Sequence, residues 1–138
     1  MTKMNIEQIQ WPETIEIRHL VLWPDKPPEF CQVEGDNAAR HFGVKIGGEL
    51  VSVASIFTEG SAARLRKFAT LPAFQGQGIG TALLEHMIAL LKGENVRYFW
   101  CDARESSLAL YQRFGMRPEG ERFYKGDNPY FRMGVCFN

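Results

Sequence analysis

The stretch Phe74-Gln-Gly-Gln-Gly-Ile-Gly80 places three glycines at alternate positions between two segments of regular structure. Residues 66–70 before it are typical of a strand, and residues 81–91 after it have the apolar spacing of an amphipathic helix. Glycine lets a backbone approach a ligand closely, and a helix start presents unpaired N–H groups and a partial positive charge. The loop therefore predicts an anion-binding site, with a ligand-free glycine turn as the alternative.

Two common phosphate-binding motifs do not fit this loop. A Walker A loop needs a lysine directly after its last glycine, and here Thr81 follows Gly80. The dinucleotide fingerprint Gly-x-Gly-x-x-Gly ends at Thr81 when it is counted from Gly76, and at Leu83 when it is counted from Gly78. These mismatches argue against a nucleotide-binding domain of either type.

Length, charge and cysteine content exclude several other classes. A chain of 138 residues predicts a single domain, residues 1–138. Lys and Arg number 16, as do Asp and Glu, so nothing favours a nucleic-acid or membrane partner. Cys31, Cys101 and Cys136 form no C-x-x-C pair, which argues against a metal site or a disulfide framework. Without a signal peptide or a membrane-length apolar run, we expect a cytoplasmic location.

Short strands separated by turns fill the rest of the chain. Residues 14–22 favour a helix that ends at Trp23-Pro24, although residues 15–18 also fit a strand. Gly47-Gly48 is typical of a two-residue hairpin turn, and Gly115 of the cap of a short helix, 106–114. Residues 25–37 are expected to be a loop. The expected strands are 4–10, 41–46, 50–57, 63–70, 97–103, 121–125 and 130–136.

The connection through the central helix decides the fold class. A strand–helix–strand step from residue 65 to residue 103 makes those two strands parallel, while the hairpins elsewhere make their strands antiparallel. The sequence therefore predicts an α/β (α+β) domain with a mixed, mostly antiparallel sheet and helices on its faces.

Four segments resemble the GNAT family of N-acetyltransferases. Gln75-x-x-Gly78-x-Gly80 resembles the family's Q/R-x-x-G-x-G/A loop, which cradles the pyrophosphate of acetyl-CoA. Residues 68–72 are similar to its fourth strand, residues 103–116 to a motif ending Tyr-x-x-x-Gly-Phe, and residues 126–133 to the tail of some small bacterial members. The resemblance covers residues 65–133. Two positions depart from the pattern: Arg104 stands where many members have Asn, and Met116 replaces Phe.

The resemblance implies a small, single-domain bacterial-type enzyme. It implies a twisted sheet with helices on both faces and a central parallel pair splayed between residues 68–70 and 100–103. The implied activity is direct transfer of an acetyl group from acetyl-CoA to a primary amine, without a metal; the alternative is a non-catalytic acyl-CoA-binding or sensory module. The acceptor, a small molecule or a peptide, is not identified, and family analogy suggests a homodimer.

The resemblance also assigns the site residues. Tyr111 is the expected acid that protonates the departing thiolate, although its spacing with Leu108 and Phe114 equally fits a core residue. A backbone N–H near Phe68 is the expected oxyanion donor. The residues expected to bind the cofactor are Phe68, Ala69, Thr70, Gln75, Gly76, Gln77, Gly78, Ile79, Gly80, Thr81, Arg104 and Ser107.

No clear base emerges for the accepting amine. His41, Glu121 and Arg66 are the candidates for a base or for substrate binding, and structural or solvent-exposed roles are alternatives for His41 and Glu121. Cys101 is expected to be a buried structural thiol, because direct transfer needs no covalent nucleophile. Arg64, Arg66 and Lys67 form a basic cluster that is either solvated or an anion-binding wall.

Overall fold

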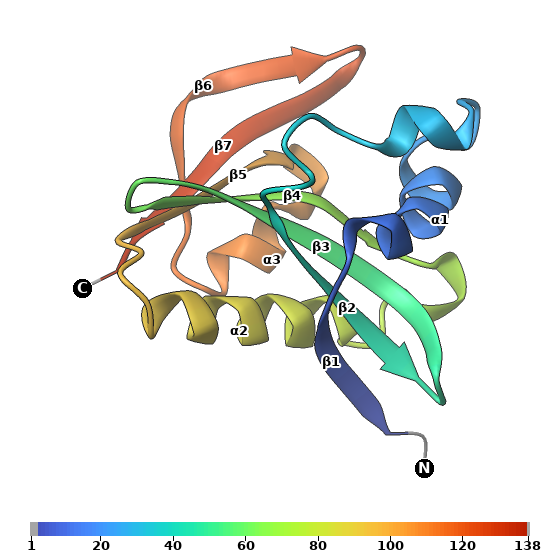
Figure 1. The fold of residues 1–138 in the computed structure, drawn as a ribbon. Helices are drawn as coiled ribbons and strands as arrows, with labels where there is room; N and C mark the ends of the chain where they lie inside the picture. Colours follow the sequence, from blue (N-terminus) through green and yellow to red (C-terminus); the bar gives the residue numbers. More distant parts are fainter. Residues whose placement is uncertain (1–2, 138) are drawn as a thin grey trace.

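The computed structural model describes residues 3–137 as one sheet of seven strands in the order β1-β2-β3-β4-β5-β7-β6 (Figure 1). Strands β4 and β5 are parallel, and every other neighbouring pair among the described residues is antiparallel. The predicted mixed sheet with one parallel pair is thus confirmed. The strands are β1 (Met4–Ile9), β2 (Arg40–Ile46), β3 (Glu49–Glu59), β4 (Ala62–Thr70), β5 (Tyr98–Arg104), β6 (Arg117–Lys125) and β7 (Asn128–Cys136).

The hairpin between β2 and β3 turns at the two glycines that predicted it. Gly47 and Gly48 have φ angles of 59° and 83°, a left-handed region that residues with a side chain rarely adopt. Ile46 pairs with Glu49 across the turn. The turn therefore sets the pairing of β2 with β3 at this end, and the register shifts by one residue between Val44 and Lys45.

Helix α2 (Ile79–Lys92) covers one face of the sheet (Figure 1). Its apolar side joins side chains of β2 to β5, of β7 and of the short helix α3 (Leu108–Gln112) in the main core. The predicted helix 81–91 is confirmed, and it begins two residues earlier. The residues that α2 buries are Ile79, Leu83, Leu84, Met87, Ile88 and Leu91.

A second helical segment covers the opposite face. It begins with a 3₁₀ turn at Trp11–Thr14, continues as α1 (Ile15–Ile17) and widens into a π turn over Arg18–Leu22. The helix that the sequence favoured here is confirmed, and the alternative strand is wrong. Ile17 packs with Val53, whereas the next residue along β3, Ala54, belongs to the main core. Because successive strand side chains point to opposite faces, the sheet has a core on each side.

Strands β4 and β5 separate after three paired positions. Their parallel pairing ends at Arg64 and Trp100. Directly afterwards β4 bulges against β3: Ser55 pairs with Arg66 but Val53 pairs with Ala69. A bulge bends the strand that contains it, which turns β4 away from β5. The expected splay of the parallel pair is therefore confirmed, and it begins just before residues 68–70.

Some element boundaries differ from the predictions. Strand β6 begins at Arg117 rather than at residue 121. The sequence did not predict this start, because the first residues of the strand are exposed, include Pro and Gly, and show no apolar alternation. The helix expected at 106–114 is a 3₁₀ turn at Glu105–Ser107 followed by α3, and the loop at 25–37 contains a 3₁₀ turn at Pro28–Cys31.

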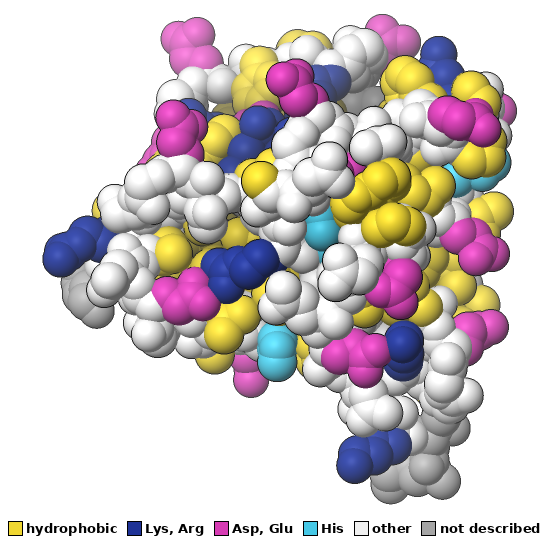
Figure 2. Space-filling model, viewed as in Figure 1, with side chains coloured by type: hydrophobic (Ala, Val, Ile, Leu, Met, Phe, Trp, Pro, Cys, Tyr) yellow, Lys and Arg dark blue, Asp and Glu magenta, His cyan; other side chains and the backbone are white. Residues whose placement is uncertain are grey.

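The described surface carries charges of both signs. On the face seen in Figure 2, Lys and Arg side chains alternate with Asp and Glu without one large area of a single sign. Within residues 3–137, none of the helices has the length and apolar character needed to cross a membrane.

Candidate active site

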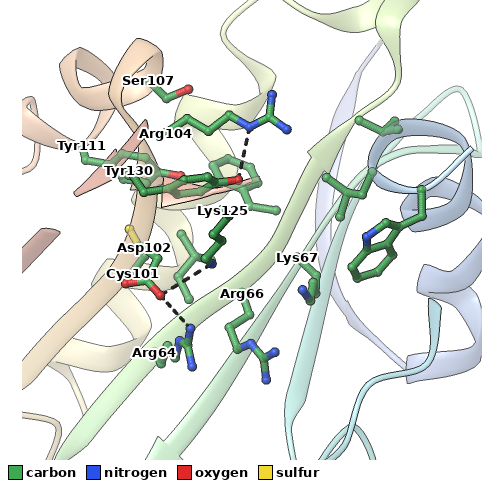
Figure 3. Close-up of a pocket in the computed structure, with 16 residues that line it drawn as sticks. Arg64, Arg66, Lys67, Cys101, Asp102, Arg104, Ser107, Tyr111, Lys125 and Tyr130 are labelled. Carbon is green, nitrogen blue, oxygen red and sulfur yellow. Dashed lines mark hydrogen bonds and ion pairs between the residues drawn. The ribbon is translucent and has the colours of Figure 1, made fainter. Parts of the chain in front are cut away.

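A cleft of about 480 Å³ opens where β4 and β5 diverge (Figure 3). This volume lies in the range of small-molecule binding sites. The cleft draws on five parts of the chain: the N-terminal helical segment, β4, β5, the region of α3, and the β6–β7 hairpin. Its lining consists of Val21, Leu22, Trp23, Arg64, Leu65, Arg66, Lys67, Phe68, Cys101, Asp102, Ala103, Arg104, Ser107, Tyr111, Lys125 and Tyr130.

The glycine loop forms the start of α2. Gly78 has a φ angle of 81° and directly precedes the helix, and the first helical hydrogen bond runs from the N–H of Ala82 to the carbonyl of Gly78. The N–H groups of residues 79–81 therefore have no acceptor within the helix. They present the partial positive charge of the helix start to whatever lies in front of it.

Close packing explains the last glycine of this loop. A side chain at Gly80 would place its Cβ 3.1 Å from the ring of Phe68, which lines the cleft. The side chain of Gln75 donates to the carbonyl of Thr70 at 2.9 Å, and that of Gln77 donates to the carbonyl of Ala73 at 3.1 Å. These contacts hold the loop next to the end of β4 and leave its exposed backbone free of side chains.

Tyr111 lies in the wall of the cleft and is only 8% exposed. It lies beside the thiol of Cys101 on β5, and burial together with that neighbour raises the pKa of the phenol well above its usual value. Tyr111 also belongs to the main core. The two sequence interpretations of this residue are therefore both compatible with its position.

Cys101 is the buried thiol that the sequence predicted. Burial, and to a lesser degree the neighbouring carboxylate of Asp102, raises the pKa of this thiol to about 12. A thiol with that pKa is protonated at neutral pH, and only a thiolate is an effective nucleophile. The environment of Cys101 thus argues against a covalent role.

The basic cluster of β4 faces the cleft, as Figure 3 shows. Arg64 donates to the carboxylate of Asp102 at 3.0 Å and lies over the ring of Trp100. Arg66 lies over Phe57, with its guanidinium 4.9 Å from the ring centroid. The pKa of Arg66 is lowered by burial and by the adjacent Arg64. Because a guanidinium is protonated at neutral pH and is donor-only, Arg66 suits anion binding better than base catalysis.

Lys67 completes the basic cluster at the bulge of β4. Its φ angle of 55° is the only positive one among the non-glycine residues that the structure describes. The ammonium lies 4.5 Å from the ring centroid of Trp23, which follows the N-terminal helical segment. Burial, followed by the charges of Arg66 and Lys125, lowers the pKa of Lys67 to about 8.

Several lining residues were not predicted. Asp102 had no distinguishing pattern within its aromatic strand, and it pairs with Arg64 and, at 3.7 Å, with Lys125. The hydroxyl of Tyr130 accepts from Arg104 at 3.3 Å. Trp23 marked only the end of a helix in the sequence. Because these residues come from separate segments, no local pattern could have joined them.

The predicted cofactor residues divide into three groups. Phe68, Arg104 and Ser107 line the cleft. Ala69 and Thr70 are not in the cleft lining: the side chain of Ala69 packs in the second core, and that of Thr70 is hydrogen-bonded to Ser52, while the carbonyl of Thr70 accepts from Gln75 of the loop. Residues 75–81 form the loop and first turn of α2, next to Phe68.

Two of the base candidates lie outside the cleft. His41 is buried with Nδ1 2.7 Å from the hydroxyl of Ser55 and Nε2 2.9 Å from the carbonyl of Asp36. The carboxylate of Asp36 in turn receives two hydrogen bonds from the buried guanidinium of Arg18. Glu121 is exposed on β6. Of the three candidates, only Arg66 lines the cleft.

The structure combines a splayed parallel pair with a glycine loop at the start of the following helix. This is the arrangement that the resemblance to acyl-CoA-dependent transferases implied. Residues 4–116 match the sequence model of the acetyltransferase (GNAT) family. The chain therefore belongs to the GNAT family and is an N-acetyltransferase.

Individual relatives agree with this assignment. The chain is 35% identical to the uncharacterized N-acetyltransferase YitI of Bacillus subtilis, with 87% of each chain covered. It is 32% identical to the [ribosomal protein bS18]-alanine N-acetyltransferase of Haemophilus influenzae, covering 80% of this chain and 77% of the relative.

Solved structures share the fold. The ribosomal-protein-S18-alanine N-acetyltransferase of Escherichia coli superposes with a TM-score of 0.82 at 22% identity, covering 98% of this chain and 94% of that one. A GNAT family acetyltransferase from Elizabethkingia anophelis, solved with acetyl-CoA bound, gives a TM-score of 0.76 at 18% identity, with 97% and 98% covered.

Proposed function

We propose that this enzyme transfers the acetyl group of acetyl-CoA directly to a primary amine held in the cleft, with Tyr111 as the acid that protonates the leaving thiolate. The observation that carries the proposal is the cleft itself. It opens where β4 and β5 separate, it has Tyr111 in its wall, and it adjoins the glycine loop through Phe68. Relatives named for acetylating an alanine of a ribosomal protein support an amine acceptor.

The glycine loop suits the diphosphate of acetyl-CoA. The N–H groups at the start of α2 lack helical acceptors, and Gly76 and Gly78 leave the backbone open to a close approach. The separated edges of β4 and β5 offer backbone groups to the amides of the pantetheine arm. A backbone N–H near Phe68, at the bulge, would stabilise the oxyanion that forms as the amine adds to the thioester carbonyl.

The proton for the thiolate is supplied at the hydroxyl of Tyr111. When the tetrahedral adduct collapses, the C–S bond breaks and the electron pair stays on sulfur. The proton that the attached nitrogen loses passes to solvent, and solvent returns a proton to Tyr111. Cys101 indicates how basic a thiolate becomes at this place, because burial raises the pKa of its thiol to about 12. Tyr111 is protonated at neutral pH, because burial raises the pKa of its phenol, and it lines the cleft, so its hydroxyl could donate a proton to a thiolate bound there.

Direct transfer leaves Cys101 without a chemical role. The thiol is protonated at neutral pH, because burial raises its pKa to about 12. The amine must reach the thioester without a proton, because an ordinary alkylammonium with a pKa of about 10.4 carries no lone pair. Because no acetylated enzyme forms, both substrates must be bound together in a ternary complex.

Acetyl-CoA titration of matched glycine variants tests the cofactor site. Gly78→Val and Gly60→Val both put a side chain at a positive φ with no atom within 4 Å of the new Cβ, so both suffer similar backbone strain. Only Gly78 lies in the glycine loop; Gly60 lies in the turn between β3 and β4. By calorimetry we expect Gly78→Val to weaken acetyl-CoA binding about tenfold or more, ~1.4 kcal/mol, and Gly60→Val to bind normally.

Turnover provides the second arm of this test. Wild-type protein should release free CoA thiol from acetyl-CoA only when an amine is present. Equal affinity of the two glycine variants would overturn the loop assignment. Binding of acetyl-CoA without turnover on any amine would instead favour the non-catalytic module.

A further inference from the structure

The cleft carries an unbalanced positive charge, in contrast to the mixed surface of Figure 2. Among the described residues that line it, Asp102 is the only carboxylate, and it is paired with Arg64 and Lys125. The cations of the lining are Arg64, Arg66, Lys67, Arg104 and Lys125.

Three of the described cations in this lining, Arg66, Lys67 and Arg104, lack a counter-charge. Arg104 is exposed and donates to the hydroxyl of Tyr130, so Arg66 and Lys67 are the two that are both unpaired and partly buried. Within residues 3–137, neither has a carboxylate within ion-pair distance, although both are partly buried. Each is held instead over an aromatic ring, Arg66 over Phe57 and Lys67 over Trp23. Holding two adjacent cations partly away from water is unfavourable unless an anion joins them.

We propose that the acceptor is a primary amine that carries a carboxylate a short distance away, and that Arg66 and Lys67 bind this carboxylate. The assignment rests on the proposed acetyl transfer, because it concerns the second substrate of the same cleft. The carboxylate could belong to a free amino acid or to an acidic residue near the N-terminus of a peptide. Both sources present the same chemistry to a guanidinium and an ammonium.

The phosphates of acetyl-CoA are the competing anions. They are expected at the start of α2, which covers one face of the sheet. Lys67 instead contacts Trp23, at the end of the helical segment that packs in the second core on the opposite face. The pair of cations therefore faces the side from which an acceptor would approach a thioester lying in the splay.

The same charges would assist the chemistry. A positive environment disfavours an ammonium and favours the neutral amine, which is the reactive form. The pKa of Lys67 is lowered in the same direction, to about 8, first by burial and then by the charges of Arg66 and Lys125. An ammonium without its own carboxylate would be repelled from this cleft, whereas a molecule that also carries a carboxylate is attracted to it.

Substrate pairs that differ by one charge test the proposal. Alanine and glutamate would be compared with alaninamide and glutamine, and the amidated dipeptide Ala-Glu with Ala-Gln. We expect kcat/KM to fall about tenfold or more on replacing the recognised carboxylate by a carboxamide, as for the loss of a charge-assisted hydrogen bond. The amino-acid and dipeptide arms distinguish the two sources of the carboxylate.

Charge-neutral variants locate the binding groups. Arg66→Gln and Lys67→Gln should each raise KM for the acidic acceptor about tenfold while leaving KM for acetyl-CoA near that of the wild type. Arg97→Gln is the matched control, because Arg97 is exposed and lies just before β5, at the paired end away from the splay. The three variants should melt at similar temperatures.

The outcomes separate the two proposals. The carboxylate assignment would be wrong if the carboxamides were turned over as well as the carboxylates or better. It would also be wrong if Arg66→Gln and Lys67→Gln raised KM for acetyl-CoA and not KM for the acceptor. Either result would leave the proposed acetyl transfer unaffected. Absence of turnover with every amine, despite binding of acetyl-CoA, would overturn the proposed function and the carboxylate assignment with it.

Discussion

Replacing Tyr111 by phenylalanine separates a catalytic role from a structural one. The substitution keeps the ring of this buried residue and removes only the hydroxyl, which lies beside Cys101. If this hydroxyl protonates the thiolate, kcat should fall about 10²–10⁴-fold, roughly 3–5 kcal/mol in activation free energy.

The effect on stability should be small. The variant loses at most one hydrogen bond of the hydroxyl, about 1 kcal/mol in the free energy of unfolding. For a domain of this size that corresponds to a fall in Tm of about 4 °C. The affinity for acetyl-CoA should hardly change, because the hydroxyl is expected to act on the thiolate and not on the intact thioester. A core role alone would give the loss of stability and spare kcat.

The assay is release of free CoA thiol at saturating acetyl-CoA and acceptor, with Tm and acetyl-CoA affinity measured on the same samples. Tyr124→Phe is the control, because Tyr124 is 60% exposed on β6. Tyr130→Phe tests the other tyrosine of the cleft, whose hydroxyl accepts from Arg104. Near-native kcat in Tyr111→Phe would refute the assignment, and a selective loss in Tyr130→Phe would move the acid to that residue.

Further predictions concern the buried thiol, the basic cluster and the buried ion pair. Cys101→Ala should keep substantial kcat, and acetylation of Cys101 detected by mass spectrometry would contradict direct transfer; in the wild type, a thiol reagent should modify the exposed Cys136 well before the buried Cys101. Burial lowers the pKa of Lys67 from 10.5 to about 8, so between these values the unfolded chain binds more protons there. Wild-type stability should therefore rise with pH over this window relative to Lys67→Gln in urea titrations, and parallel curves would refute the shift. Asp36→Asn should destabilise the fold by about 3–5 kcal/mol, because it leaves the buried charge of Arg18 unpaired; a loss below 1 kcal/mol, about that of an ordinary hydrogen bond, would contradict this.

The sequence by itself determined the elements whose cause is local. The turn at residues 47 and 48 needs positive φ angles at both positions, and glycine adopts them easily. The apolar spacing of residues 81–91 matches the buried side of α2. The loop before α2 was recognisable because its glycines and the helix start are contiguous. The parallel pair followed from a single rule about strand–helix–strand connections.

The splay was expected only from family resemblance, and the structure supplies its physical reason. One extra residue in β4 opposite β3 forms a bulge, and Lys67 at that bulge takes a left-handed backbone conformation that lysine does not favour by itself. Nothing local in Arg66-Lys67-Phe68 predicts this conformation. It belongs to the bulge, whose extra residue shifts the alternation of β4, so that Leu65 packs in the main core and Ala69 in the second.

Only the tertiary structure decided which residues share the cleft. Trp23, Lys67, Asp102 and Lys125 are far apart in the chain and meet there because sheet order and the splay bring their segments together. The same packing places His41 outside the cleft, where it is buried and hydrogen-bonded to Asp36 and Ser55, so it cannot act as the base there. Local patterns encode hydrogen bonding and apolar spacing along one element, whereas the charge of a cleft depends on side chains that different elements contribute.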